Sequence, residues 1–452
     1  MNKNRLFLWS MVAALAGFIF GFDTVVISGA NLPIKELWTK DLSPWFHGFF
    51  IMSMALWGTL AGALFGGIPT QIFGRKKVLL WIGILYTLSA FGTALAPNPY
   101  IFSIFRFIGG IGIGVSSVVA PTYISEISTP AMRGRLVAMY QFNIVFGILI
   151  AFLSNYFLAG FGGADDWRWM LGVLAIPSII YTLLVFVVPE SPRWLITKKN
   201  DLVGAKKVLS LIGVTDVDAE VNMILKANQH EAASGASSSI FNKKYSSIFW
   251  LAFWIACFNQ LSGINFILYY APEILERAGL AKQDSLANSI AIGGTNLIFT
   301  FVGVYLIDRL GRKTLLLLGS LGYIISLAAV AWAFKTSAPP NLLLTFLLLF
   351  IASHAIGQGA VIWVFISEIF PNKIRAMGQS FGASVHWVFA AVITLITPYF
   401  LDKDKGVLKD EPWKIFVFFA GMMVLQLIWV LMKVPETKGV SLEELEKKLV
   451  KD

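Results

Sequence analysis

The sequence predicts an all-α membrane protein in which twelve transmembrane helices form two pseudo-symmetric six-helix bundles. Three observations support this prediction: an apolar composition, a regular series of apolar stretches, and a set of charged motifs that occurs twice. Of the 452 residues, 57% are hydrophobic and 14% are charged. Because so few charged side chains cannot coat a water-soluble globule of this length, the bilayer is expected to be the solvent.

Twelve stretches of the chain are apolar over about 20 residues, enough for a helix to span roughly 30 Å of hydrocarbon. The spans expected in the first half are 6–30, 46–69, 78–96, 100–122, 136–158 and 168–189. Those expected in the second half are 247–271, 285–307, 314–334, 341–367, 378–400 and 413–434.

The only long polar segment separates these two sets of spans. Within it, apolar residues recur at helical spacing from Leu202 to Ile212 and from Val217 to Leu225, which predicts short amphipathic helices. The predicted domains are an N-terminal bundle, a cytoplasmic linker with short helices, a C-terminal bundle and a cytoplasmic tail. Their boundaries are 1–192, 193–246, 247–434 and 435–452.

The distribution of charge indicates how the chain is oriented in the membrane. The net charge is +10, and most Lys and Arg outside the spans fall on one side of the twelve-span arrangement. An excess of Lys and Arg marks the cytoplasmic face, so both termini are expected there, in a multi-pass protein of the cell inner (plasma) membrane. Since the membrane topology accounts for the basic residues, no nucleic-acid partner is expected.

Cys257 is the single cysteine of the chain, which excludes an intrachain disulfide and favours a buried cysteine in apolar surroundings.

Two charged motifs occur once in each half of the chain. The Ile-Ser-Glu-Ile motif around Glu126, followed by Arg133, recurs around Glu368, followed by Arg375. The other motif is Gly-Arg-Lys, at Gly74–Lys76 and at Gly311–Lys313. A duplicated apolar protein with charged signatures in matching loops is typical of a two-halved secondary transporter.

These loop residues are also expected to form a network. Topology alone would explain the basic members, but the repeated glutamates favour salt bridges between the halves that close the cytoplasmic side in one conformation. The expected members of the network are Arg75, Glu126, Arg133, Glu190, Arg312, Glu368 and Arg375.

Two charged residues lie deep in predicted spans, where a charge is costly unless it is paired or faces water. Asp23 lies in span 1 and Arg106 in span 4. They form either a structural ion pair between two helices or a proton-coupling pair. In the second case an adjacent guanidinium favours the carboxylate and desolvation favours the acid, so Asp23 would exchange a proton as its surroundings alternate.

Uncharged polar side chains form a second group of candidates for a binding site. Each amide offers two donors and two acceptors, which suits a ligand made of hydroxyl groups, and indole faces suit a pyranose ring. Any one of these residues could instead join two helices by a hydrogen bond. The candidates are Gln141, Asn259, Gln260, Asn265, Asn296, Trp363 and Trp387. His386, beside Trp387, either contacts the ligand or supports a helix contact.

Several motifs in order give the chain a resemblance to the sugar porter family of the major facilitator superfamily over essentially its whole length. They are the Gly-Arg-Lys motifs, Arg133-Gly134-Arg135, Pro189–Arg193, Gln260–Asn265 with Tyr269-Tyr270, Asp308–Arg312 and Pro435–Gly439. The resemblance implies the major facilitator fold and a monosaccharide site at Gln141, Gln260, Asn265, Asn296 and Trp363. It also implies an extracellular gate at Tyr269 and Tyr270 and the role of Asp23 with Arg106 as the proton-coupling pair of bacterial xylose and hexose symporters.

The sequence departs from the family pattern at three places in the expected pocket. Asn259 stands where a second glutamine is usual, His386 where an amide is usual, and the segment from Gly359 to Trp363 lacks the common prolines. These departures predict a sugar pocket whose selectivity differs from the family pattern and which takes either a hexose or a pentose.

The expected function is proton-coupled import of a monosaccharide by alternating access, by a monomer in the lipid bilayer with protons and sugar as its ligands. The rivals are a facilitative uniporter, which would not need Asp23, and a transporter-like sugar receptor, which the short tail disfavours. No zinc-type histidine motif and no nucleophile with a base occurs in the spans, so an enzyme, a metal site and a cofactor are not expected.

Overall fold

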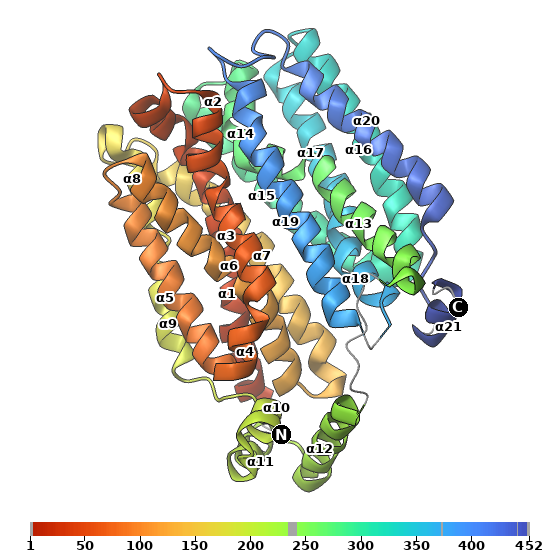
Figure 1. Ribbon diagram of the computed structural model, residues 1–452. Helices are drawn as coiled ribbons and strands as arrows, with labels where there is room; N and C mark the ends of the chain where they lie inside the picture. The colour runs from red at the N-terminus through yellow and green to blue at the C-terminus, as the bar shows by residue number, and fades with distance from the viewer. Residues whose placement is uncertain (1–2, 234–241, 372–373, 441, 450–452) are drawn as a thin grey trace. The chain divides into compact units, whose positions relative to one another are not determined.

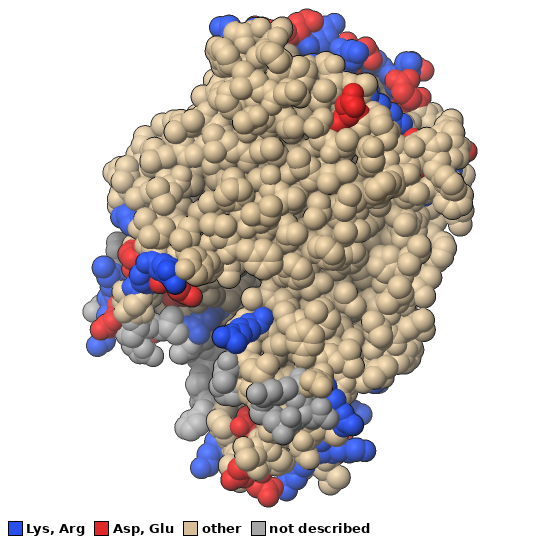
Figure 2. All heavy atoms as spheres, turned by 180° about the vertical axis from the view of Figure 1, so that it is seen from behind, with Lys and Arg blue, Asp and Glu red and all other residues tan. Residues whose placement is uncertain are grey.

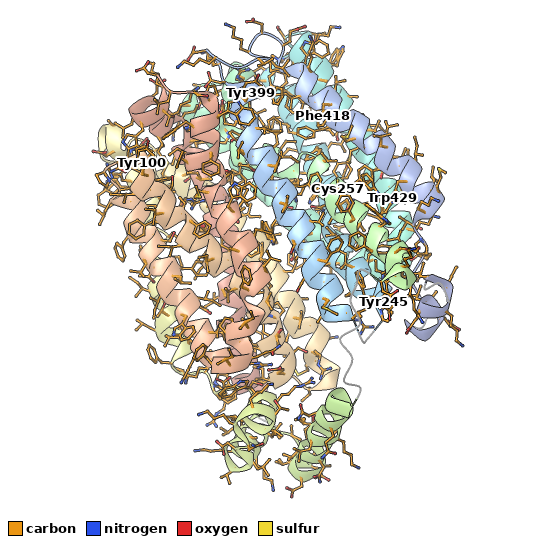
Figure 3. All side chains as sticks on the ribbon, in the orientation of Figure 1. Tyr100, Tyr245, Cys257, Tyr399, Phe418 and Trp429 are labelled. Atoms are coloured by element: carbon orange, nitrogen blue, oxygen red, sulfur yellow. The ribbon has the colours of Figure 1, made fainter. Side chains whose placement is uncertain are left out.

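The computed structural model describes residues 3–233, 242–371, 374–440 and 442–449, and all regular elements in these ranges are helical (Figure 1). In this part of the chain, 12 helices are long and apolar enough to cross a membrane. The predicted all-α fold with twelve spans is therefore confirmed. Cys257, labelled in Figure 3, lies in the apolar core of the second half as predicted, with 2% of its surface exposed.

The first half of the chain contains the six N-terminal spans and the linker helices. Its longer helices are α1 (Lys3–Ile34), α3 (Met54–Phe65), α4 (Gly67–Phe73), α5 (Arg75–Ala94), α6 (Pro99–Ile127), α7 (Pro130–Leu158), α8 (Asp166–Gly172), α9 (Ala175–Val185), α11 (Leu202–Ile212) and α12 (Val217–Ala233). Its short elements are η1 (Lys35–Thr39), α2 (Pro44–Phe46), η2 (His47–Ser53), η3 (Gly163–Asp165), α10 (Pro192–Trp194) and η4 (Leu195–Lys199). Helices α11 and α12 confirm the amphipathic segments predicted in the linker.

The second half contains the remaining spans and a short helix near the C-terminus. Its elements are η5 (Lys243–Tyr245), α13 (Ser246–Leu261), α14 (Ile264–Arg277), α15 (Lys282–Leu310), α16 (Arg312–Lys335), α17 (Pro340–Ile356), α18 (Gln358–Ile369), α19 (Arg375–Leu401), α20 (Trp413–Lys433) and α21 (Leu442–Leu449).

The chain forms two compact units whose limits differ from the two halves of the sequence. Unit 1 comprises 1–24, 57–151 and 171–236, and unit 2 comprises 25–56, 152–170 and 237–452. The C-terminal part of α1 and the elements up to the start of α3 thus belong to the same unit as the second six spans. The domain boundaries read from the sequence stay a prediction.

Each unit has one end that carries a terminal segment of the chain. In unit 1 the start of α1 and the linker helices α10 to α12 lie at the same end (Figure 1). In unit 2, α21 packs against α18 at the end where α18 finishes. We call these the terminal ends and the opposite ones the far ends. On the face drawn in Figure 2, charged side chains gather toward the ends and uncharged residues cover the broad middle, as expected for a surface that faces lipid.

Two helices of unit 1 approach each other closely because glycines line their contact. A Cβ at Gly58 of α3 would lie 2.2 Å from the carbonyl oxygen of Phe107, and a Cβ at Gly114 of α6 would lie 2.2 Å from that of Thr59. Both distances are well inside van der Waals contact, so a larger residue at either position would force α3 and α6 apart. In lipid, where apolar surface gives no drive for association, such close backbone packing is a main source of helix–helix stability.

Two spans of unit 2 are discontinuous, and the first break lies beside the candidate site described below. Span 7 is divided into α13 and α14 at Gly263, which has a φ of +88°. Span 10 is divided into α17 and α18 at Gly357, where φ is −84° and ψ is −102°. The second break occurs without the prolines common in the family. Interrupted helices that free backbone and side-chain groups inside the membrane are typical of transporter binding sites.

Candidate functional site

The two charged residues predicted inside spans contact each other in unit 1. Arg106 Nη1 on α6 donates to Asp23 Oδ1 on α1 over 2.6 Å, and Arg106 Nη2 lies 3.4 Å from the backbone oxygen of Asp23. Both side chains are almost fully buried. A buried charge needs a partner to be tolerated, and each of these charges supplies the partner of the other. The pairing proposed from sequence is therefore present, and its role in proton coupling stays a prediction.

In unit 2 the amides of span 7 form one hydrogen-bonded cluster centred on Gln260. Gln260 Nε2 donates to Asn259 Oδ1 over 2.9 Å, and Asn265 Nδ2 donates to Gln260 Oε1 over 2.9 Å. Gln260 Nε2 also lies 3.2 Å and 3.3 Å from the two ring nitrogens of His386 on α19. The break at Gly263 brings Asn265 of α14 back to Gln260 of α13, so three amides and an imidazole converge.

Aromatic rings border this cluster. The ring centroid of His386 lies 5.1 Å from that of Trp363 on α18 and 4.8 Å from that of Trp387. Trp363 keeps 39% of its surface exposed, whereas Trp387 is 6% exposed. Trp363 therefore offers an accessible indole face beside hydrogen-bonding groups, and Trp387 serves mainly as packing behind His386. This combination can hold a ring that carries hydroxyl groups.

Two further candidates lie apart from these bonds. Asn296 on α15 is 6% exposed, and among the described residues its amide makes no hydrogen bond with the cluster. Gln141 lies on α7 in unit 1. A shared site that includes Asn296 and Gln141 stays a prediction.

The two tyrosines expected at the gate lie on α14, where the helix is distorted. Tyr270 has a φ of −114° and a ψ of 16°, which are not helical values, and Pro272 follows two residues later. The hydroxyl of Tyr270 donates to the backbone oxygen of Thr394 on α19 over 2.9 Å, and both tyrosines are 1% exposed. The distortion arises because proline lacks an N–H and its ring clashes with the preceding turn. It gives α14 a bend at the residues that the family resemblance associates with gating.

A chain of polar side chains joins α1 to α14 at the far end of unit 2. Asn31 Nδ2 donates to Glu273 Oε2 over 2.8 Å, His47 Nε2 lies 2.7 Å from Asn31 Oδ1, and Thr39 Oγ1 lies 2.8 Å from His47 Nδ1. Because an amide oxygen only accepts, His47 must carry its proton on Nε2, and Thr39 then donates to Nδ1. All four side chains are less than a tenth exposed.

An ion pair lies at the same end. Lys35 Nζ is 2.7 Å from Asp402 Oδ2, just beyond α19. Burial acts to raise the pKa of Asp402, but the bond from Lys35 and the backbone N–H groups of Lys405 and Asp404 outweigh it, so the pKa lies below its ordinary value. Tyr399, labelled in Figure 3, adds an aromatic contact with Trp45, at 4.8 Å between ring centroids. The far end of unit 2 is thus held together by polar and aromatic contacts.

At the terminal end of unit 1, the first copy of the charged motifs forms a compact network. Arg75 Nε and Nη2 donate to the two oxygens of Glu126 over 2.8 Å and 2.7 Å. Glu190 Oε1 accepts from the backbone N–H groups of Arg75 and Lys76 over 2.8 Å and 3.2 Å. The hydroxyl of Ser191 donates to Glu126 over 2.6 Å.

The second copy repeats this arrangement in unit 2. Arg312 Nε and Nη2 donate to Glu368 over 3.1 Å and 2.7 Å. Glu436 accepts from the backbone N–H groups of Arg312 and Lys313 over 2.8 Å and 3.0 Å, and Thr437 donates to Glu368 over 2.6 Å. The sequence repeat is therefore a repeat of hydrogen bonds as well.

A glycine at each helix start permits this arrangement. Gly74 has a φ of +93° and Gly311 a φ of +89°, in the region that favours glycine. A Cβ at these positions would also meet a carboxylate oxygen, at 2.3 Å for Glu190 and 2.5 Å for Glu436. The glycines are thus needed for both the turn and the approach of the acidic side chain to the helix N-terminus, where negative charge is favoured.

The two copies differ in their electrostatics. Burial raises the pKa of Glu190 above its ordinary value despite the N–H groups that it accepts from. Glu436 is less buried, so the backbone N–H groups of Lys438, Arg312, Lys313 and Thr437 outweigh its burial and its pKa is lowered. The second copy also has an additional ion pair, between Arg312 and the exposed Asp308 at 3.2 Å.

The expectation that these charges bridge the two halves is wrong for the pairs described here. The pair of Arg75 with Glu126 lies within unit 1, and that of Arg312 with Glu368 lies within unit 2. The reason is local: each arginine begins a helix whose packing partner carries the matching glutamate. Arg133 is exposed and its side chain makes no hydrogen bond among the described contacts. Arg375 Nε donates to the backbone oxygen of Phe370 over 3.2 Å, so neither arginine joins the networks.

Sequence reasoning missed several buried polar residues of unit 2. They include Asn31, His47 and Glu273 at the far end, and His354, whose Nδ1 lies 2.6 Å from the hydroxyl of Tyr323. The rule that identified Asp23, that an ionisable residue within a span has a partner, would have found His354 in span 10. It would have found Glu273 only if span 7 had been extended beyond residue 271 to its observed end at Arg277.

Twelve apolar helices in two repeated sets, broken spans and a buried polar cluster define a membrane transporter of the major facilitator type. A profile of the family named Sugar (and other) transporter matches residues 9–449. The chain belongs to this family and is a multi-pass membrane protein.

Relatives and solved structures agree with this assignment over the full length. The chain is 33% identical to the D-xylose-proton symporter of Escherichia coli (strain K12), over 98% of this chain and 96% of that protein. It is also 33% identical to the arabinose-proton symporter of Bacillus subtilis (strain 168), over 100% of this chain and 96% of that protein. The partially occluded inward open structure of the xylose transporter XylE from E. coli matches with a TM-score of 0.85 at 30% identity, covering 97% of this chain and 100% of that one.

Proposed function

We propose that this protein is a proton-coupled symporter that imports a monosaccharide by alternating access. The observation that carries the proposal is the buried ion pair of Asp23 with Arg106 at 2.6 Å in unit 1. A uniporter has no need for a carboxylate inside the membrane, whereas a symporter needs one group that binds and releases the coupled proton. Relatives named as proton symporters for xylose and arabinose support the same conclusion.

The substrate class follows from the cluster around Gln260. Asn259, Gln260, Asn265 and His386 supply donors and acceptors together, as sugar hydroxyl groups require, and Trp363 supplies an accessible ring face. Gln260 orients the other three side chains, since it bonds to each of them. Asn296 and Trp387, which lies behind His386, are further proposed contacts in unit 2, and Gln141 is proposed on the family resemblance.

In the proposed cycle the proton and the sugar bind from outside and leave to the cytoplasm. Neutralisation of Asp23 weakens its attraction to Arg106, so α1 and α6 gain freedom to move relative to each other. The bend at Tyr270 lets the far half of α14 move against the pocket, as expected of a gate. The two six-helix bundles then alternate between two discrete arrangements.

The surroundings of the protein follow from the same proposal. The lipid bilayer solvates the apolar middle of each unit, in the cell inner membrane. Both termini and the linker helices lie in the cytoplasm, with the charged networks of Arg75 and Arg312 at that face. The transporter works as a monomer, because one chain carries both the proton pair and the sugar cluster.

Uptake by purified protein in proteoliposomes tests this function. Labelled D-xylose, L-arabinose, D-galactose and D-glucose are each supplied outside, with the outer medium more acidic than the lumen. We expect transient accumulation of at least one of them above the outside concentration, and that sugar serves as the probe sugar below. Uptake that only reaches the outside concentration would show a uniporter, and binding without uptake would show a receptor.

His386 is expected to set the order of preference among sugars. Neutral imidazole offers one donor and one acceptor where an amide offers two of each, so it accepts a narrower pattern of hydroxyl groups. His386→Gln is therefore expected to change the ranking of unlabelled hexoses and pentoses as competitors of the probe sugar, while expression and proton coupling change less. An unchanged ranking would place His386 outside the selectivity-determining contacts, as a support for Gln260 alone.

A further inference from the structure

On α1, α5 and α6 of unit 1, several buried polar atoms have no hydrogen-bond partner among the described residues, and three of them belong to the ion pair of Asp23 with Arg106 and to Ser89. These three are Asp23 Oδ2, Ser89 Oγ and Arg106 Nε. The position that a Cβ would take at Gly109 of α6 lies 2.3 Å from Ser89 Oγ and 3.8 Å from Asp23 Oδ2. Because Gly109 has no side chain, the serine hydroxyl and the second carboxylate oxygen border the same small space.

The hydroxyl of Ser89 differs from its neighbours on α5. Thr87 donates to the backbone oxygen of Gly83 over 2.8 Å, and Thr93 donates to that of Ser89 over 2.7 Å, as hydroxyl groups in apolar helices commonly do. Ser89 makes no such bond although it is 1% exposed. A buried hydroxyl without a hydrogen-bond partner costs free energy. Because the Ser89 hydroxyl points toward Gly109 of α6, we expect its partner to lie outside α5.

The internal repeat supplies a comparison for Ser89. Gly74 and Gly311 occupy equivalent places in the repeat, before α5 and α16. The number of residues from Gly74 to Ser89 on α5 equals the number from Gly311 to Ser326 on α16. Ser326 is fully buried as well, but its hydroxyl donates to the backbone oxygen of Gly322 over 2.7 Å. The two serines thus share a place in the repeat and differ in their bonding. The difference coincides with the presence of a carboxylate, Asp23, beside Ser89.

The chemistry of the ion pair determines where a proton can bind. Arg106 Nη1 donates to Asp23 Oδ1, and a guanidinium has donors only, so a proton on Oδ1 would face another N–H. The proton of the neutral acid must therefore be on Oδ2. In the charged form Oδ2 needs a donor, and in the neutral form its O–H needs an acceptor. A serine hydroxyl can act in both ways.

The other titratable groups of this region are engaged elsewhere. The hydroxyl of Tyr86 on α5 donates to Ser116 Oγ over 3.0 Å, and that of Tyr140 on α7 lies 3.3 Å from the same oxygen. The hydroxyl of Tyr181 on α9 donates to the backbone oxygen of Leu79 over 3.1 Å. Ser89 is thus the described side chain with an unused hydroxyl next to Asp23 Oδ2.

We propose that Ser89 is the positioning residue for the coupled proton. Its hydroxyl donates to Asp23 Oδ2 in the charged form and accepts from the Oδ2–H group in the neutral form, directly or through one water that Arg106 Nε also contacts. A buried water commonly makes about three hydrogen bonds, which these three atoms supply. The proton adds to Oδ2 and leaves from it, and Ser89 keeps its own proton throughout. This inference rests on the proposed proton coupling by Asp23.

The test compares the pH profile of probe-sugar uptake in proteoliposomes for wild type, Ser89→Ala and the matched control Ser326→Ala. A hydrogen bond to an ionised group is stronger than one to a neutral group, so loss of the hydroxyl disfavours the carboxylate more than the acid. We expect the profile midpoint to move upward by about one pH unit, a tenfold change in proton affinity, with an unchanged KM for the sugar. Ser89→Thr, which keeps a hydroxyl, is expected to retain the wild-type midpoint, as is Ser326→Ala.

The possible results separate the inference from the function on which it rests. If wild type fails to accumulate sugar, the proposed function is wrong, and if Asp23→Asn still accumulates it, the role of Asp23 in proton coupling is wrong. If both behave as proposed and Ser89→Ala has the wild-type midpoint, only the role of Ser89 is wrong. An equal shift in Ser326→Ala would likewise overturn it, since packing would then account for the effect. A shift in Ser89→Ala that is lost when Asp23→Asn is also present would support it.

Discussion

Replacement of Asp23 by asparagine is expected to abolish accumulation of sugar against its gradient while exchange of sugar across the membrane remains measurable. The asparagine amide could still accept from Arg106 but could not bind and release a proton. One proton that crosses about 150 mV supplies roughly 3.5 kcal/mol, enough for a gradient of several hundredfold. The measurement is steady-state accumulation of the probe sugar in energised proteoliposomes, alongside counterflow without a proton gradient.

Two controls make this result specific. Removal of one partner from a buried ion pair costs about 3–5 kcal/mol of stability, so retained counterflow must show that the variant is folded. Asp165→Asn removes the acidic member of an exposed pair with Arg168, at 2.9 Å, and is expected to leave accumulation unchanged. Accumulation by Asp23→Asn to the wild-type level would show that the buried pair is structural.

Replacement of Gln260 by alanine is expected to weaken sugar binding at least tenfold. Gln260 bonds to Asn259, Asn265 and His386. Its loss therefore removes one contact with the sugar and leaves these three side chains without the hydrogen bonds that orient them. A buried hydroxyl without its partner costs about 1–3 kcal/mol, which corresponds to roughly five- to 150-fold in affinity. Binding is measured by calorimetry or by quenching of the fluorescence of Trp363.

Gln426→Ala is the matched control for this prediction. Gln426 is a fully buried amide of the same unit, which accepts from Gln358 over 3.0 Å and donates to Ser320 over 2.8 Å. Its loss is expected to lower thermal stability with little change in sugar affinity. Equal losses of affinity in both variants, or an unchanged affinity in Gln260→Ala, would remove Gln260 from the site.

The fold and the loop networks were largely accessible from the sequence because they depend on patterns that recur. Span length follows from bilayer thickness, and the repeated Gly-Arg-Lys and Ile-Ser-Glu-Ile motifs indicated that Arg75 and Arg312 occupy equivalent environments. The partners within each network were harder to assign. Matching loops predict that two arginines have the same role, but they do not show whether each glutamate belongs to the same bundle or to the other one.

The sequence predicted which residues form the candidate site better than it predicted the hydrogen bonds between them. Amides of span 7 were identified by their unusual polarity inside a span. Their convergence depends on the break at Gly263, which returns Asn265 to Gln260, and a continuous helix would not produce it. The break at Gly357 was also not expected, because the sequence lacks the prolines that commonly mark it.

The contrast between Ser89 and Ser326 shows what local sequence cannot supply. Both serines follow the same motif in an apolar helix, and nothing near them in the chain distinguishes a hydroxyl bonded to its own helix from one turned to a neighbour. The difference arises from a glycine and a carboxylate on other helices, Gly109 and Asp23. Such contacts between distant segments require the tertiary structure.

The measurement that tests proton symport most directly is the pH of the medium around de-energised cells that contain the protein, when the probe sugar is added. Inward movement of sugar with protons predicts a transient rise in external pH. The rise should be absent in Asp23→Asn, and in wild type after a proton ionophore. Sugar entry at the wild-type rate with no change in external pH would contradict proton coupling and identify the protein as a uniporter.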